Sequence, residues 1–219
     1  QAELAYADMH IALLDTPGHV DFGTEMERTL QVLDYVVLVI NGMDGVQSHT
    51  ETLWKLLERY GIPVFIFVNK MDMTGYDRDY LMDNIRHRLS DGCVDFLCED
   101  SGEQIAMCDE AMLETGANDE QDVVNAIAGR KLFPCYFGSA LKNEGVSELL
   151  DGMNRYVVEP VRGEEFGARV FKIGRDDKGE RLTYMKVTGG VLKLKDVLTL
   201  RNSQGEESHE KVNQIRVYS

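Results

Sequence analysis

The sequence predicts an α/β protein with a doubly wound, mostly parallel sheet, followed by a small antiparallel β-barrel. Short apolar runs at residues 11–14, 35–40, 64–68 and 132–137 alternate with segments whose apolar residues recur at helical spacing. Alternating strands and helices of this kind are typical of a parallel sheet. From about residue 168 apolar and polar residues alternate between glycine-containing turns, which indicates antiparallel strands.

The helices and strands are predicted in the following order. Strands are expected at 10–14, 35–40, 64–68 and 132–137, and helices at 22–33, 48–60, 78–89 and 145–156. The runs at 35–40 and 64–68 are continuously apolar, which predicts strands covered on both faces. In the C-terminal part strands are expected at 168–173, 181–187, 191–194, 196–200 and 211–218.

Two segments interrupt this order and suggest the domain organisation. Residues 91–130 carry eleven acidic residues and one basic residue, Arg130, so we expect a peripheral acidic insertion with one or two short helices. Residues 161–167 are rich in glycine and charge and are predicted to be a linker between domains at 1–160 and 168–219. The charge changes there too, because residues 1–163 carry a net −17 and residues 164–219 a net +2.

The composition limits the partners and the compartment. A net charge of −15, concentrated in the first domain, argues against a nucleic-acid surface spread over that domain. No apolar run approaches the roughly 20 residues that cross a membrane, so no membrane partner is expected. The four cysteines lack the spacing of a zinc site or a disulfide framework, which predicts reduced thiols in a cytoplasmic protein.

Polar loops follow three of the predicted strands, at residues 15–21, 41–44 and 69–72. In parallel sheets ligands bind at the carboxyl ends of the strands, so these loops predict one site. Asp15 ends an apolar strand, and Gly18 follows after Pro17. A carboxylate beside a glycine that permits close approach suits a magnesium-phosphate site, although a turn or helix cap is the common role of such an aspartate.

Residues 69–72, Asn-Lys-Met-Asp, directly follow a predicted buried strand. The carboxylate of Asp72 can accept hydrogen bonds from N1–H and the 2-amino group of guanine, a donor pair that adenine lacks. Asn69 can reach the N7 and O6 side of the base and tie neighbouring loops together, and the stem of Lys70 can cover the ring. After the last strand, Ser139 and Ala140 can offer a backbone amide to the guanine oxygen.

These motifs resemble those of the translational GTPases. Asp-Thr-Pro-Gly-His at 15–19, Asn-Lys-Met-Asp at 69–72 and Ser-Ala at 139–140 look like three of the signature loops of that family, and they occur in the same order. Within the family the chain is most similar to elongation factor G and the tetracycline-resistance ribosomal protection proteins. Residues 132–140, 169–173 and 181–184 favour the second group. The resemblance implies a GTPase domain of the P-loop NTPase type followed by a translation-factor β-barrel domain.

The resemblance also implies roles for individual residues. Asp15 would hold Mg²⁺ through a water, the amide of Gly18 would bind the γ-phosphate, and His19 would position the attacking water. The implied partners are GTP or GDP, Mg²⁺ and the ribosome, with its RNA and proteins, for a monomeric protein. The nucleotide-binding residues that it implies are Asp15, Thr16, Pro17, Gly18, Asn69, Lys70, Asp72, Ser139 and Ala140.

One departure from the family is large. The sequence has no Gly-x-x-x-x-Gly-Lys-Ser/Thr phosphate-binding loop and no first switch segment. We therefore expect the chain to be an internal fragment of a GTPase whose complete form hydrolyses GTP on the ribosome. The polypeptide itself is expected to bind GTP weakly or not at all and to be inactive.

Two other functional classes are open. The chain could be a non-catalytic ribosome- or RNA-binding module that uses basic residues of the barrel, namely Arg169, Lys172, Lys186, Lys193 and Lys195. Alternatively, Asp15, His19 and Asp21 could be ligands of a metal-dependent hydrolase. The second alternative leaves residues 69–72 and 139–140 without a role.

Overall fold

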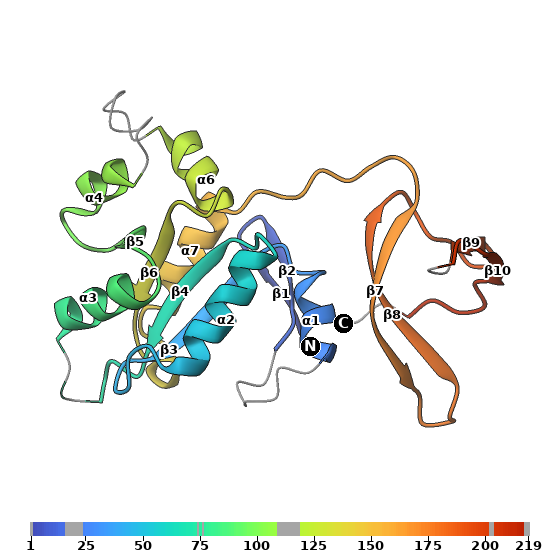
Figure 1. Ribbon diagram of the computed structural model, residues 1–219, viewed down its shortest axis with the longest axis horizontal. Helices are drawn as coiled ribbons and strands as arrows, with labels where there is room; N and C mark the ends of the chain where they lie inside the picture. Colours follow the sequence, from blue (N-terminus) through green and yellow to red (C-terminus); the bar gives the residue numbers. More distant parts are fainter. Residues whose placement is uncertain are drawn as a thin grey trace. The chain divides into compact units, whose positions relative to one another are not determined.

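The computed structural model describes residues 2–15, 24–73, 75, 77–108, 119–201 and 204–216 (Figure 1). These residues form two compact units. The α/β unit comprises residues 6–9 and 33–159, and the hairpin unit comprises residues 1–5, 10–32 and 160–219. The predicted domain limits at 160 and 168 stay a prediction.

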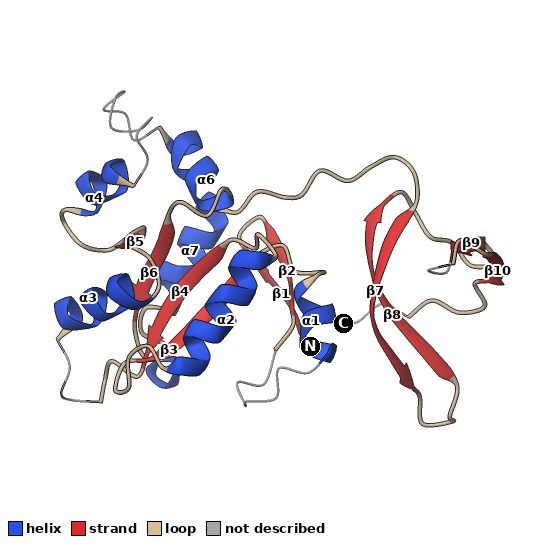
Figure 2. Ribbon diagram, viewed as in Figure 1, coloured by secondary structure: helices blue, strands red, loops and turns tan. Residues whose placement is uncertain are grey.

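The α/β unit contains the parallel sheet that the sequence predicts (Figure 2). Its four strands are β3 (Val36–Asn41), β4 (Val64–Asn69), β5 (Cys93–Asp95) and β6 (Phe133–Phe137), in the spatial order β3-β4-β6-β5. Each neighbouring pair is parallel. The register pairs Asn41 with Asn69 and Val68 with Phe137, so the carboxyl ends of β3, β4 and β6 lie at one edge of the sheet.

Helices cover both faces of this sheet. The main helices of the unit are α2 (Ser48–Arg59), α3 (Arg78–Arg88), α6 (Glu120–Ala128) and α7 (Val146–Tyr156), with a short α4 at Ser101–Met107. Trp54 of α2 meets the ring of Phe133 with centroids 4.6 Å apart. Gly152 of α7 lies against Tyr136, three residues further along β6. Because side chains alternate along a strand, α2 and α7 lie on opposite faces.

The core is centred on β4. Its residues Val64 to Val68 are all buried, as a strand covered on both faces requires. The edge strand β3 differs from the prediction, because Val39 is 58% exposed. Among the described residues β3 pairs only with β4 and is therefore an edge strand. Neighbouring strand side chains cover it on one side only, which leaves Val39 open to solvent.

The acidic segment 91–130 corrects the expectation of a peripheral insertion. Its start forms β5, which joins the parallel sheet as an edge strand beside β6, and all three residues of β5 are buried. Its end forms α6, where Val123, Val124 and Ile127 face the core. The acidic composition hid these residues, since only a few apolar positions separate a core helix from a solvated one.

The hairpin unit contains paired strands and one short helix. Most of β1 (Ala2–Tyr6) and β2 (Met9–Leu13) belongs to it, together with α1 (Thr24–Leu30). The antiparallel pairs are β7 (Gly167–Arg175) with β8 (Arg181–Gly189), and β9 (Val197–Arg201) with β10 (Glu207–Lys211). In the described residues these pairs remain two separate sheets, where the sequence predicts one barrel.

Three strand predictions in this unit are wrong in detail. Residues 191–194 form no strand, because the chain turns at 193–196, where the amide of Lys193 donates to the Asp196 carboxylate (2.7 Å). Of the strand predicted at 211–218, residues 212–216 form no strand and residues 217 and 218 lie outside the described residues; the observed strand is β10, whose residues are all exposed and lack an alternating pattern. The apolar run at 11–14 predicts a buried strand, but β2 pairs only with β1 in the described chain and Leu13 is 46% exposed.

Two cations of the β7–β8 pair bind the end of α1. Arg169 Nη1 donates to the carbonyl of Gln31 (3.0 Å), and Lys186 Nζ donates to the carbonyl of Val32 (2.9 Å). Both carbonyls lie in the turn directly after Leu30, the last residue of α1, and cations near the C-terminus of a helix interact favourably with its partial negative charge.

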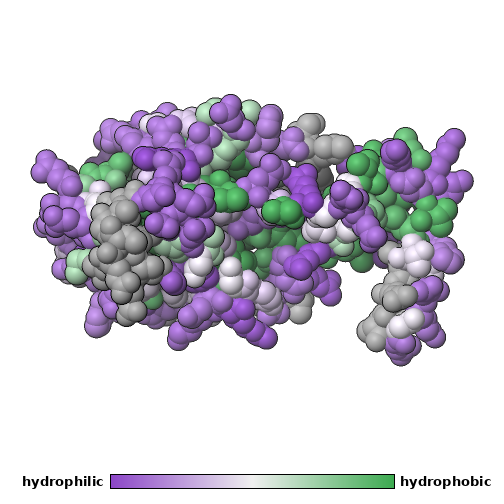
Figure 3. Space-filling model, turned by 90° about the horizontal axis from the view of Figure 1, so that it is seen from above, coloured by the Kyte–Doolittle hydropathy of each residue, from purple (hydrophilic) through white to green (hydrophobic). Residues whose placement is uncertain are grey.

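The visible surface is mostly hydrophilic, with hydrophobic residues in small patches (Figure 3). This agrees with the 28% of charged residues in the sequence. No described helix has the length and apolar character needed to cross a membrane.

Candidate functional site

Asn69, the last residue of β4, joins three loops at the edge of the sheet. Its Oδ1 accepts hydrogen bonds from the amides of Lys70 (2.8 Å) and Ala140 (2.9 Å). Its carbonyl accepts a third bond from the amide of Gly42 (2.8 Å). The side chain therefore links the loops after β4 and β6, while its backbone links the loop after β3.

The loop after β3 packs closely against the loop after β4. A Cβ on Gly42 would lie 2.9 Å from Met71 Sδ and 3.1 Å from the carbonyl of Asn69, so only glycine fits without a shift. Asn41 shapes this loop by donating to Asp44 (2.5 Å) and accepting from the amide of Met43 (3.1 Å). The sequence predicts that this loop belongs to the site, but no pattern in it predicts the close approach of Gly42 to Asn69 and Met71.

Lys70 has an unusual backbone conformation for a residue with a side chain. Its φ is +67°, in the left-handed region, which costs about 1–2 kcal/mol for an L-amino acid. The bond from its amide to Asn69 Oδ1 and the bond from Met73 N to its carbonyl (3.1 Å) hold this conformation. Strain of this kind persists where the surroundings determine it and is frequent at binding sites.

Asp72 is a carboxylate that the neighbouring loop keeps ionised. A hydrogen bond from the Ser139 hydroxyl is the main cause that lowers the pKa of Asp72, and its own backbone and the positive charge of the Lys142 ammonium lower it further. Lys142 Nζ lies 3.6 Å from Asp72 Oδ2. The side chain of Asp72 is 15% exposed, so its oxygens are in reach of solvent or ligand. The part that Lys142 plays was not predicted.

The loop that carries Ser139 is held rigidly. Ser139 is 1% exposed and exchanges two backbone hydrogen bonds of 3.0 Å with Glu144. Gly138 donates to the carbonyl of Val68 (2.9 Å) and accepts from the amide of Met71 (3.0 Å). A Cβ on Gly138 would collide with the carbonyl of Glu144, so this close approach requires glycine.

The predicted phosphate half of the site is described only at its first residue. Asp15 follows β2 in the hairpin unit and is exposed. Thr16, Pro17, Gly18, His19 and Asp21 lie outside the described residues. Within the described chain no group of three or more His, Cys, Asp or Glu side chains forms a metal cluster. A single exposed carboxylate still fits Mg²⁺, which takes few protein ligands and completes its shell with water and phosphate oxygens.

The predicted base-binding residues, by contrast, lie together. The structure places Asn69, Asp72, Ser139 and Ala140 in one network, in which the Ala140 amide donates to Asn69. The result is an ionised carboxylate with accessible oxygens beside a rigid loop of backbone groups. This arrangement can accept two hydrogen bonds from adjacent donors on a planar heterocycle.

Comparisons with known proteins agree with this geometry. The elongation factor Tu GTP binding domain matches residues 1–159. The oxytetracycline resistance protein of Streptomyces rimosus is 33% identical over 88% of this chain, and TetM of transposon Tn1545 from Enterococcus faecalis is 31% identical over 89%. Each match covers 34% of the relative, so the chain spans about a third of the length of these proteins.

A solved structure supports the fold. A crystal structure of a Thermus thermophilus protein superposes with a TM-score of 0.76 at 23% sequence identity, covering 95% of this chain and 39% of that one. The family match extends over most of the sequence and contains every predicted nucleotide-binding residue. The chain therefore belongs to the elongation factor Tu GTP binding domain family.

Proposed function

We propose that the complete protein binds GTP and GDP and recognises guanine through Asn69, Lys70, Asp72, Ser139 and Ala140. The observation that carries this proposal is the shared network of the two loops, in which the Ala140 amide donates to Asn69 (2.9 Å) and Lys142 forms an ion pair with Asp72 (3.6 Å). A random polar turn after β4 would have no reason to be fixed from the loop after β6.

The chemistry of the base fits Asp72. Guanine presents N1–H and a 2-amino group side by side, and an ionised carboxylate accepts both. An aspartate carboxylate is in this accepting form at neutral pH, and the lowered pKa of Asp72 extends the form to lower pH. Lys70, held in its left-handed conformation, can lay its apolar stem over the ring.

The activity of the complete protein follows from the family and is part of the proposal. Asp15 would bind Mg²⁺ through a water, the Gly18 amide would bind the γ-phosphate, with Thr16 and Pro17 shaping that loop, and His19 would position the attacking water. GTP would be hydrolysed on the ribosome by a monomeric, cytoplasmic factor. Because the relatives are named tetracycline resistance proteins, ribosome protection from tetracycline is the proposed role, with elongation factor G-like function as the alternative.

The base proposal has a direct test in Asp72→Asn. Asparagine presents one acceptor and one donor, which match the N1–H and 2-oxo groups of xanthine and mismatch guanine. We expect the substitution to weaken GDP binding by about 100-fold and to strengthen XDP binding, as expected when a bond to a charged group is lost and a donor is left unpaired. The measurement is a calorimetric titration of the complete protein with GDP and XDP.

A matched variant controls for charge. Asp83→Asn removes an exposed carboxylate of α3 and should leave both affinities unchanged. Unchanged GDP affinity in the Asp72 variant would refute the proposed recognition.

The RNA-binding alternative is less well supported. Two of its five basic residues, Arg169 and Lys186, donate to backbone carbonyls at the end of α1. A third, Lys172, places its ammonium 5.9 Å from the ring centre of Tyr184. For the metal-dependent hydrolase, two of the three proposed ligands lie outside the described residues, and no observation favours it.

A further inference from the structure

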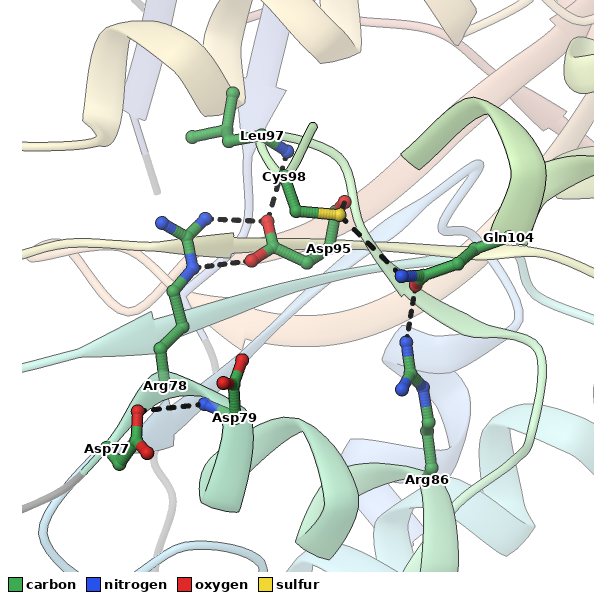
Figure 4. Close-up of polar contacts among 8 residues, drawn as sticks. All are labelled: Asp77, Arg78, Asp79, Arg86, Asp95, Leu97, Cys98 and Gln104. Atoms are coloured by element: carbon green, nitrogen blue, oxygen red, sulfur yellow. Dashed lines mark hydrogen bonds and ion pairs between the residues drawn. The ribbon is translucent and has the colours of Figure 1, made fainter. Parts of the chain in front are cut away.

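Arg78, the first residue of α3, contacts side chains of two neighbouring strands, and Figure 4 shows its contact with Asp95 of β5. Its Nη2 donates to Asp95 Oδ1 (2.6 Å), and its Nε forms an ion pair with Asp95 Oδ2. Its guanidinium carbon lies 4.7 Å from the centre of the Phe137 ring. Asp95 is the last residue of β5, and Phe137 is the last residue of β6.

These contacts fix the orientation of Arg78. The side chain of Asp95 is 7% exposed, and its Oδ1 also accepts from the amide of Leu97 (3.0 Å), so the carboxylate cannot turn freely. A planar guanidinium can fork onto both carboxylate oxygens and stack on a ring at the same time, which a lysine cannot do. We call the three side chains Arg78, Asp95 and Phe137 the α3 clamp.

The α3 clamp lies at the ends of both base-binding loops. The loop that begins at Asn69 and carries Asp72 ends where α3 begins, with Asp77 capping the helix by accepting from the amide of Asp79 (3.3 Å). Phe137 directly precedes Gly138, Ser139 and Ala140. Arg78 therefore joins the far end of one loop to the start of the other.

We propose that Arg78 is a positioning residue for base recognition, which sets the spacing between Asp72 and the loop at 138–140. The inference rests on the proposed guanine site. Arg78 contacts no base in this arrangement; it acts through the two loops that it holds together. Its loss should therefore impair discrimination between bases, and not only the stability of the fold.

Arg86 offers a matched comparison on the same helix. Its Nε donates to the carbonyl of Cys93 (3.0 Å) and its Nη2 donates to Gln104 Oε1 (2.6 Å), as Figure 4 shows for Gln104. Like Arg78 it ties α3 to β5, but it contacts neither base-binding loop. Removing Arg86 tests what a purely structural arginine of α3 contributes.

The experiment measures the affinities of the complete protein for GDP and IDP. IDP lacks the 2-amino group, so it loses one of two hydrogen bonds to Asp72, and the unaltered protein should prefer GDP by about 10- to 100-fold. The main variant combines Arg78→Met with Asp95→Asn, so that no buried carboxylate is left unpaired. Arg78→Lys keeps the charge without the fork, and Arg86→Met is the control.

We expect the double variant to lower the preference for GDP over IDP by about fivefold or more. Arg78→Lys should restore only part of it, and Arg86→Met should leave the preference unchanged while lowering the melting temperature. A preference equal to that of the unaltered protein in the double variant would overturn the role of Arg78 and leave the guanine site standing. Failure of the unaltered protein to bind GDP would overturn both.

Discussion

At the scale of single residues, the candidate site depends on side chains that do two things at once. Asn69 shapes two loops with one oxygen, and Asp72 is held in its accepting form by Ser139 from another loop. Lys70 adopts a costly backbone conformation, because its φ of +67° suits glycine better. The cost indicates that its side chain serves a purpose other than stability.

The substitution Lys70→Gly tests whether the side chain of Lys70 lowers the stability of the fold while it contributes to nucleotide binding. Glycine adopts the left-handed conformation without strain, so we expect the free energy of unfolding to rise by about 1 kcal/mol. GDP affinity should fall, because no stem covers the base. Urea denaturation and nucleotide titration measure the two effects, and lower stability of the variant would show that Lys70 is not strained.

Lys55→Gly provides the opposite control for that substitution. Lys55 is exposed in the middle of α2, where glycine should lower stability by about 1 kcal/mol.

At the scale of secondary structure elements, α7 is fixed to the sheet by an unusually close approach. A Cβ on Gly152 would collide with the hydroxyl oxygen of Tyr136, which is 2% exposed on β6. Burial raises the pKa of Tyr136 far above its ordinary value, so the group is neutral at all physiological pH values. The approach brings α7 against β6, the strand that leads into the loop at 138–140.

Gly152→Ala should therefore lower the free energy of unfolding by about 1–3 kcal/mol, as overpacking of a core does. Adding Tyr136→Phe removes the colliding oxygen and should recover part of the loss, so the two substitutions should not be additive. Chemical denaturation of both single variants and the double variant measures the coupling. If the two changes in the free energy of unfolding simply add, α7 moves away from β6 in the Gly152 variant, and the contact with Tyr136 does not determine the position of the helix.

Much of this architecture was predictable from the sequence, and the reasons are local. Continuous apolar runs identified β4 and β6, and the helical spacing of apolar residues identified α2 and α7. The residues at 69–72 and 139–140 stood out because each follows such a run. Gly42, Lys142 and Arg78 were not found, since their roles depend on which loops meet in space and no pattern near them in the sequence records that meeting.

At the scale of the whole molecule, the hairpin unit is held together by contacts between residues far apart in the sequence. Arg169 and Lys186 reach the carbonyls of Gln31 and Val32 at the end of α1. Their pairing with backbone groups, in a part of the chain with little net charge, makes them structural cations in this unit.

Replacing Arg169 and Lys186 with methionine should lower the local stability of α1. We expect faster amide hydrogen exchange in α1 and a loss of about 1 kcal/mol in its local stability, because two charged donors to the helix end are removed. Exchange followed by mass spectrometry measures this, with Lys193→Met, an exposed lysine, as the control. Unchanged exchange in α1 would show that its position does not depend on the β7–β8 pair.

The division into two compact units has a consequence for how such a protein can be rearranged. Residues 10–32 cluster with residues 160–219, and the intervening stretch forms most of the other unit. Neither unit is a continuous piece of sequence. A gene fusion that exchanges the C-terminal residues alone would thus leave α1 facing a foreign surface, so we expect successful chimaeras within this family to inherit both segments from one parent.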